Sequence, residues 1–178
     1  MKHFLLASAI SLIFIYGCAQ PQNISTSFPT KECSTPLAEI YVESITHEKN
    51  DLNITPEFIK ALLEKNLKDN CLVIAKEPSS NTYLVKINYK TSLQSSSDEK
   101  IASSEVKNIL SSEVTLSLKN KTTTKNFKGK NSIRINGKKI LSIGQDASIT
   151  QEDKNQSTNE AFQAAYHSML NSFDTGVK

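Results

Sequence analysis

Cysteines carry the clearest covalent chemistry in this sequence, and the first one lies in a recognisable setting. Cys18 closes residues 15–18 (IYGC), which follow an apolar stretch over residues 4–16 and the positive charge of Lys2. This order is typical of a bacterial lipobox, in which a small residue such as Gly17 lets a peptidase cut just before the cysteine. We expect the Cys18 thiol to carry a diacylglyceryl group and the freed amine a further acyl chain, a combination that anchors a protein permanently.

The leader before Cys18 is predicted to be a targeting signal and not a membrane span, because its apolar stretch is too short to cross a hydrocarbon core of about 30 Å as a helix. We predict a signal peptide over residues 1–17, a lipidated flexible tether over residues 18–36, and one domain over residues 37–178. Ala19 stands where lipoproteins of the inner membrane commonly carry aspartate. This favours the outer membrane, with the domain facing the periplasm. An ordinary secretory signal with a chance cysteine is the alternative.

Cys33 and Cys71 remain once Cys18 is lipidated, and in an oxidising compartment an even remainder suggests a disulfide. Cys33 precedes the first expected strand and Cys71 begins the second, so both thiols lie at one end of the sheet if those strands are parallel. The bridge would stabilise the fold by about 4 kcal/mol in the chain-entropy model. The alternative is two reduced thiols. Neither cysteine has a Cys or His at ligand spacing, so we expect no metal site and no cofactor.

Two asparagines fit the extended acceptor pattern of bacterial N-glycosylation, which places an acid two residues before Asn and Ser or Thr two residues after it. They are Asn53, within residues 51–55 (DLNIT), and Asn155, within residues 153–157 (DKNQS). Each is expected in a polar loop before a helix, where an enzyme could reach it. The alternative is capping chemistry, since such residues cluster before helices for structural reasons.

The side chains that catalysis requires are scarce. His47 lies in a polar turn and His167 on the last expected helix, and there is no Gly-x-Ser-x-Gly motif or phosphate-binding glycine loop. We therefore do not expect an enzyme. The mature chain has 20 basic and 18 acidic side chains, a formal charge of +2, and no basic stripe is visible along the sequence. Nucleic acid is accordingly not an expected partner.

Apolar periodicity divides the domain into elements. In chain order we expect a strand over residues 37–45, a turn over 47–53, a helix from 56 to 70, a short strand over 71–76, a long strand over 83–93, a mobile loop over 94–104, a hairpin over 113–130, a segment of uncertain role over 133–143 and a final helix. Thr55 as N-cap before Pro56 marks the first helix. Val85, Ile87 and Tyr89 are expected on the buried face of the long strand.

Turn and cap residues organise the second half of the domain. Residues 120–121 (NK) sit where a hairpin turn belongs, and residues 136–137 (NG) form the strongest hairpin dipeptide. The segment around the latter either extends the sheet or forms a separate flap. Ser157 and Glu160 make a capping box at the start of the final helix. The fold class is thus α+β, with two helices on one face of a mixed or antiparallel sheet of four or five strands, in β-α-β-β-β-α order.

This element order behind a lipobox resembles the YajG-type family of bacterial lipoproteins. The resembling stretches are FIKALLEKNLKDN at 58–70, YLVKINYKTSL at 83–93, VTLSLKNKTTTKNFK at 114–128 and NEAFQAAYHSMLNSF at 159–173. The order also resembles LptE, the lipoprotein that plugs and helps assemble the lipopolysaccharide translocon, and the LpoB-like activators of peptidoglycan synthases. The chain lacks the Cys-Gly-Tyr opening of LptE and the long proline-rich tether of LpoB-like proteins.

All three families are binding or scaffold proteins. The resemblance therefore implies a non-catalytic binding or scaffold component of the envelope, anchored in the outer membrane through its N-terminal lipid. The implied partners are other envelope proteins, either a β-barrel or a peptidoglycan-associated enzyme. The alternative functions are an LptE-like lipopolysaccharide assembly protein and an activator of a peptidoglycan synthase.

Overall fold

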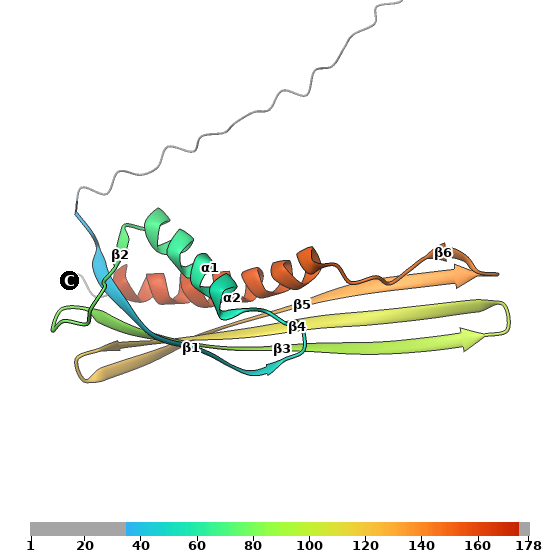
Figure 1. Ribbon diagram of the computed structural model, residues 1–178, viewed down its shortest axis with the longest axis horizontal. Helices are drawn as coiled ribbons and strands as arrows, with labels where there is room; N and C mark the ends of the chain where they lie inside the picture. The colour runs from blue at the N-terminus through green and yellow to red at the C-terminus, as the bar shows by residue number, and fades with distance from the viewer. Residues whose placement is uncertain (1–34, 175–178) are drawn as a thin grey trace, which may run out of the picture. The chain divides into compact units, whose positions relative to one another are not determined.

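The computed structural model describes residues 35–174, which form a six-stranded sheet and two helices (Figure 1). The elements in chain order are β1 (Ala38–Asn50), α1 (Pro56–Asp69), β2 (Leu72–Ile74), β3 (Tyr83–Lys100), β4 (Ser103–Asn120), β5 (Thr123–Ile140), β6 (Ile143–Gln145) and α2 (Gln151–Asp174). The predicted signal peptide, Cys18, the tether up to residue 34 and Cys33 lie outside the described residues.

The sheet is mixed, with strand order β2-β1-β3-β4-β5-β6. β1 is parallel to both β2 and β3, whereas β3, β4, β5 and β6 form an antiparallel meander. The predicted α+β class with two helices is confirmed. The predicted count of four or five strands and the order β-α-β-β-β-α are wrong, because five strands and not three lie between α1 and α2. The last of these five is the short strand β6, which makes six strands in all.

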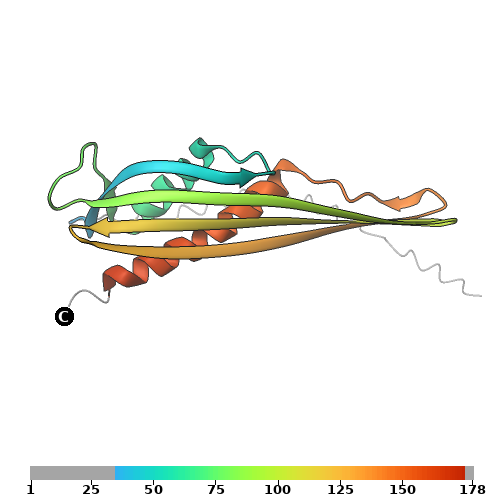
Figure 2. The same ribbon diagram turned by 90° about the horizontal axis from the view of Figure 1, so that it is seen from below.

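β3, β4 and β5 are 18 residues long each and stay paired over their whole length. Residues 94–104, expected as a mobile loop, instead form the end of β3, its turn and the start of β4. Serine is a weak strand former, but pairing to the neighbouring strand overrides the local preference here. Figures 1 and 2 show that the sheet continues well beyond the N-terminal start of α2, on the side where β6 lies. We call this extension the arm, residues 95–107 and 135–145.

The predicted turn at residues 136–137 is wrong, because Gly137 lies inside β5, opposite Val106. The chain turns at Leu141 and Ser142 instead. A Cβ at Gly137 would overlap the main chain of Ala147, which crosses the strand there. Glycine is therefore needed at this position for a close approach and not for a turn. The open alternative for this segment resolves as an extension of the sheet.

α1 begins as predicted. Thr55 Oγ1 accepts a hydrogen bond of 3.2 Å from the Phe58 N–H, and Pro56 follows at the first helical position. The helix ends at Asp69, one residue earlier than predicted, and the left-handed residue after it is Cys71, with φ of 57°. The polar turn predicted over residues 47–53 is also shorter, since β1 continues to Asn50.

α2 begins at Gln151, six residues before the predicted capping box. Its first turn is capped by Thr150, whose N–H donates to Asp153 Oδ2 at 2.8 Å while Asp153 N–H donates back to Thr150 Oγ1 at 3.1 Å. Ser157 therefore lies in the helix interior, fully buried against the sheet. The capping-box prediction failed because a second, equally good cap pattern starts earlier in the same polar segment.

Both helices cover one face of the sheet and share one apolar core with it (Figure 1). Val85, Ile87 and Tyr89 of β3 are fully buried, which confirms the predicted alternation. Neither helix among residues 35–174 is both long and apolar enough to cross a membrane. The opposite face of the sheet carries no helix among the described elements (Figure 2).

Candidate binding site

The open face of the sheet displays side chains from β3, β4 and β5 in cross-strand rows. Register places Lys90 opposite Glu113 and Glu113 opposite Lys130, which gives one charged row. The next row, two residues along each strand, contains only serines: Ser92, Ser111 and Ser132. Because side chains alternate between faces, residues two apart on one strand share a face, so both rows point the same way. We call these two rows the lysine–serine site.

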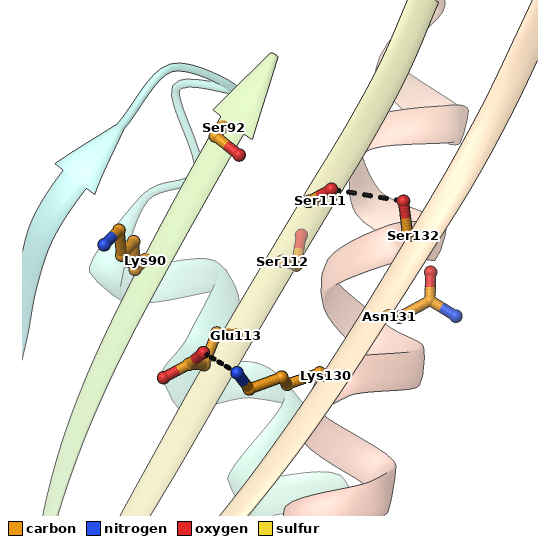
Figure 3. A pocket seen from close by; sticks show the side chains of 8 residues that line it. All are labelled: Lys90, Ser92, Ser111, Ser112, Glu113, Lys130, Asn131 and Ser132. Carbon is orange, nitrogen blue, oxygen red and sulfur yellow. Dashed lines mark hydrogen bonds and ion pairs between the residues drawn. The ribbon is translucent and has the colours of Figure 1, made fainter. Parts of the chain in front are cut away.

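A shallow cavity of about 450 Å³ lies over these rows (Figure 3). Its lining residues are Lys90, Ser92, Ser111, Ser112, Glu113, Lys130, Asn131 and Ser132. Ser111 and Ser132 are joined across the strands by a hydroxyl contact of 3.1 Å, which Figure 3 draws as a dashed line. Ser92 makes no such contact among the described residues. The site therefore offers hydroxyls and ammonium groups side by side on a rigid antiparallel platform.

Glu113 is the acidic centre of the charged row. Its carboxylate accepts from Lys128 Nζ at 2.7 Å and from Lys130 Nζ at 2.8 Å. These hydrogen bonds to two ammonium groups lower the pKa of Glu113 from 4.5 to about 2. Lys90, on the other side of Glu113, forms no ion pair within residues 35–174. Lys90 is thus available to a ligand, whereas Lys130 shares the Glu113 carboxylate with Lys128.

The surrounding face is strongly basic. Six cross-strand rows, from Lys86 to Ser96 on β3, contain 18 outward positions. Six of these are basic, namely Lys86, Lys90, Lys107, Lys128, Lys130 and Arg134, whereas Glu113 is acidic and Ile109 is aliphatic. Lys86 also has an ion-pair partner on β1, Glu43, at 3.1 Å. No basic stripe is visible along the sequence, because this one is assembled by register from three strands.

α2 supports this site from the opposite face of the sheet. Ser112 Oγ lies 3.0 Å from Ser157 Oγ and 3.1 Å from Thr158 Oγ1, and all three residues are buried. One strand over, Asn131 Nδ2 donates to Glu160 Oε2 at 2.6 Å. Ser112 and Asn131 therefore use their side chains to hold the helix. The strands beneath the lysine–serine site are consequently fixed from behind.

Of the two cysteines in the predicted disulfide, only Cys71 lies among the described residues. The parallel pairing of β1 with β2, on which the argument for it depended, is confirmed. Cys71 accepts a hydrogen bond of 2.7 Å from the Leu37 N–H, so its main chain lies beside the start of β1. Cys71 is not a free thiol. Since Cys33 lies outside the described residues, its pairing with Cys71 stays a prediction.

The two candidate glycosylation positions differ in setting. Asn53 is exposed in the turn before α1, with φ of 55°. Asn155 was expected in a loop but lies inside α2, where its side-chain oxygen accepts from Gln151 Nε2 at 2.9 Å. The loop setting is thus confirmed for Asn53 and wrong for Asn155. Modification of either residue stays a prediction.

The two histidines of the domain lie apart from the site. His47 is on β1 and packs against Tyr89 with ring centroids 5.4 Å apart, whereas His167 is on α2 beside Tyr166, with a centroid distance of 6.3 Å. Within residues 35–174, no group of three or more His, Cys, Asp or Glu side chains is placed to hold a metal ion.

Sequence reasoning missed the lysine–serine site altogether. Alternation along residues 83–93 does place Lys86, Lys90 and Ser92 on the face away from the core. What it lacks is register, because the rows exist only once Glu113 and Ser111 are set opposite them. The hairpin turn predicted at residues 120–121 lies one residue later, at 121–122, because Asn120 pairs with Thr123. Placing it there would have supplied the partners on β5.

Comparison with known proteins gives no family. No protein-family model matches the chain, and no curated protein matches it. Among solved structures, one similar chain is described as a homolog of a neuraminyllactose-binding hemagglutinin, from Helicobacter pylori; it is 11% identical, with 79% of this chain and 86% of that chain covered and a TM-score of 0.48. A hypothetical protein of Chlamydia trachomatis is 10% identical, with 79% and 95% covered and a TM-score of 0.30. At such TM-scores neither similarity carries an argument about function.

Proposed function

We propose that the protein is a lipid-anchored component of the bacterial envelope, facing the periplasm from the outer membrane, and that it is a non-catalytic binding or scaffold protein. Its ligand is an acidic envelope glycan, which lies across the open face of the sheet at the lysine–serine site. The observation that carries this proposal is the pairing of a charged row, Lys90–Glu113–Lys130, with a serine row directly beside it. The anchor and the compartment rest on the leader ending at Cys18.

The chemistry of the face favours a polar, anionic ligand. Ammonium groups act as point charges toward carboxylate or phosphate oxygens, and serine hydroxyls both donate to and accept from sugar hydroxyls. Six basic groups gathered on one face raise the local concentration of anions even though the whole mature chain is nearly neutral.

A stable protein interface is a poorer fit to the same face. The buried centres of such interfaces are apolar and rich in aromatic residues. The 18 outward positions of the six rows contain one aliphatic residue, Ile109, and no aromatic one. Partner proteins of the envelope, whether a β-barrel or a peptidoglycan enzyme, would then meet the protein elsewhere or through the glycan.

Binding can be tested with the full-length processed protein and two purified envelope polymers, peptidoglycan sacculi and lipopolysaccharide. We expect cosedimentation with one of them that weakens as salt rises. The double change Lys90→Ala/Lys130→Ala should lower the affinity about tenfold or more. Lys65→Ala/Lys68→Ala is the matched control, because it removes the same charge from the exposed side of α1.

Equal loss of binding in both double variants would contradict the proposed site, and absence of salt-dependent binding to either polymer would contradict the proposed ligand. Selective binding to lipopolysaccharide would favour an LptE-like assembly role. Selective binding to sacculi would favour action beside a peptidoglycan synthase.

The anchor is tested separately by metabolic labelling with palmitate. The wild-type protein should take up the label and fractionate with the outer membrane. Cys18→Ser should abolish the label and release the protein from that fraction. An unlabelled wild-type protein would overturn the membrane assignment without touching the binding site.

A further inference from the structure

Aliphatic side chains gather at the far end of the arm, where two neighbouring turns meet. The β3–β4 turn carries Ile101, and the β5–β6 turn carries Ile140, Leu141 and Ile143. Their exposed fractions are 110%, 55%, 74% and 80%. The Leu141 N–H donates to the Ala102 carbonyl at 3.0 Å, which joins the two turns into one surface. We call these four residues the apolar tip; Figures 1 and 2 both place it beyond the helices.

Folding alone does not account for these residues. Leu141 and Ser142 both have positive φ, 49° and 68°, in a two-residue hairpin turn between Ile140 and Ile143. Such turns favour Asn followed by Gly, because other residues are strained with φ above zero. Leu141 therefore destabilises the free protein in two ways: its main chain is strained, and its large aliphatic side chain is exposed to water. Strain of this kind is a mark of functional positions.

The chemistry of the apolar tip fits lipid better than protein. Its members are only Ile and Leu, whereas the anchors of protein interfaces are mainly aromatic residues and Arg. Two hairpin turns also offer too little area for a stable protein complex. Binding to a bilayer does not require a large contact area, because each aliphatic side chain that enters the lipid contributes its own favourable transfer free energy.

Lysines flank the apolar tip as they flank segments that lie in a membrane interface. Within residues 99–104 and 138–144 there are three lysines, Lys100, Lys138 and Lys139, and one acid, Glu99. Two of these lysines contact acids that lie just outside these two ranges: Lys100 reaches Asp98 at 3.7 Å and Lys139 reaches Asp146 at 2.5 Å. The Lys100–Asp98 pair is largely exposed, and in the second pair Asp146 is exposed while Lys139 is about one-third exposed. Lys100 in particular can therefore exchange its partner for a lipid phosphate at little cost.

We infer that the apolar tip inserts its aliphatic side chains into the headgroup region of an anionic lipid bilayer, making the arm a second membrane contact besides the lipid at Cys18. The main chain is suited to this. Lys100 pairs with Ser103 across one turn and Ile140 with Ile143 across the other, so few polar main-chain groups would enter the bilayer unsatisfied.

The chain contains no tryptophan, so a single introduced one reports the environment of the apolar tip. Full-length processed protein with Ile101→Trp is reconstituted into vesicles of phosphatidylglycerol and phosphatidylcholine, with brominated phosphatidylcholine as quencher. We expect a blue-shifted emission and strong quenching. Thr122→Trp, in the exposed β4–β5 turn at the other end of the sheet, should show neither. Adding brominated vesicles to protein held in unbrominated ones tells whether the apolar tip meets its own bilayer or a second one.

Leu141→Asn in the Ile101→Trp background separates lipid contact from folding. Asparagine suits the first position of this turn, so the thermal midpoint should rise or stay constant while quenching falls several-fold. Quenching unchanged by Leu141→Asn together with Ile143→Ser would overturn the inference. So would an unquenched Ile101→Trp signal in both vesicle arrangements, or a blue shift that depends on protein concentration without vesicles, which would instead indicate contact between copies.

Discussion

The hydroxyl of Tyr166 in α2 donates a hydrogen bond of 2.8 Å to the main-chain oxygen of Asn66 in α1. Asn66 is one of the last four residues of α1, whose carbonyls have no partner within the helix. Asn70 Nδ2 donates to the same oxygen at 2.8 Å. Tyr166, a buried residue of α2, thus helps to cap the C-terminal end of α1.

Tyr166→Phe should lower the free energy of unfolding by about 1 kcal/mol, because the hydroxyl is lost while the ring remains. The loss is moderate since Asn70 still donates to the Asn66 oxygen. Urea unfolding followed by circular dichroism measures the change. Tyr83→Phe is the control, since the Tyr83 ring packs edge-on against Phe173 and its hydroxyl has no partner within residues 35–174. An equal loss in both variants would contradict a specific role for the Tyr166 hydroxyl.

The burial of Tyr166 should also make the stability of the protein depend on pH in the alkaline range. Burial raises the pKa of Tyr166 from 10.0 to about 12. The unfolded chain therefore releases this proton first, so the contribution to stability is complete below pH 10 and is lost as pH rises toward about 12. The stability of the wild type should fall more steeply over this range than that of Tyr166→Phe. Parallel curves for the two proteins would contradict the assignment.

Acidic pH should act on the open face through Glu113. Its pKa of about 2 lies below its usual 4.5, so its contribution to stability is present above pH 4.5 and is lost as pH falls through about 2. The stability difference between wild type and Glu113→Gln should accordingly shrink over that range. In an NMR titration, Lys128→Ala/Lys130→Ala should return the Glu113 pKa toward 4.5, whereas Lys65→Ala/Lys68→Ala should leave it unchanged.

Gly129 marks the closest approach of α2 to β5. A Cβ there would overlap the main chain of Ala161 and Ala165. Gly129→Ala should therefore push the helix from the sheet and lower the free energy of unfolding by about 1–3 kcal/mol or more. Asn126→Ala, an exposed position on the same strand, should change it by less than about 0.5 kcal/mol. A neutral Gly129→Ala would mean that the contact relaxes without cost.

The predicted bridge between Cys33 and Cys71 should be visible in the mature protein as an intact mass lower by two hydrogens than that of the reduced form. Reduction, or Cys71→Ser, should destabilise the domain by about 4 kcal/mol in the chain-entropy model. Thermal unfolding with and without reductant measures this. Two titratable thiols in the untreated, processed protein would refute the pairing.

Sequence patterns predicted the parts of the fold that depend on local chemistry. The Thr55 cap, Pro56 at the first helical position and the buried alternation through Tyr89 were all readable, because each is written within a few neighbouring residues.

The remainder depends on pairing between distant residues, which local patterns do not encode. Residues 94–104 are polar and rich in serine, and only pairing with β4 makes them strand. Gly137 looked like a turn residue but serves a close approach by Ala147. The charged row failed to appear in the sequence for the same reason, since Lys90 and Lys130 are 40 residues apart and meet only through Glu113.

The buried hydroxyls behind the open face have a directional order. Thr158 Oγ1 gives its proton to the Lys154 carbonyl at 3.0 Å, so Ser112 must donate to Thr158, and Ser157 must in turn donate to Ser112. Each hydroxyl has a single proton, and this assignment uses every one. Sliding α2 by one turn would bring Ala161 opposite Ser112 and strand a hydroxyl in a dry interior. Apolar packing holds the helix on the sheet, and this short chain of hydrogen bonds fixes its position along the helix axis.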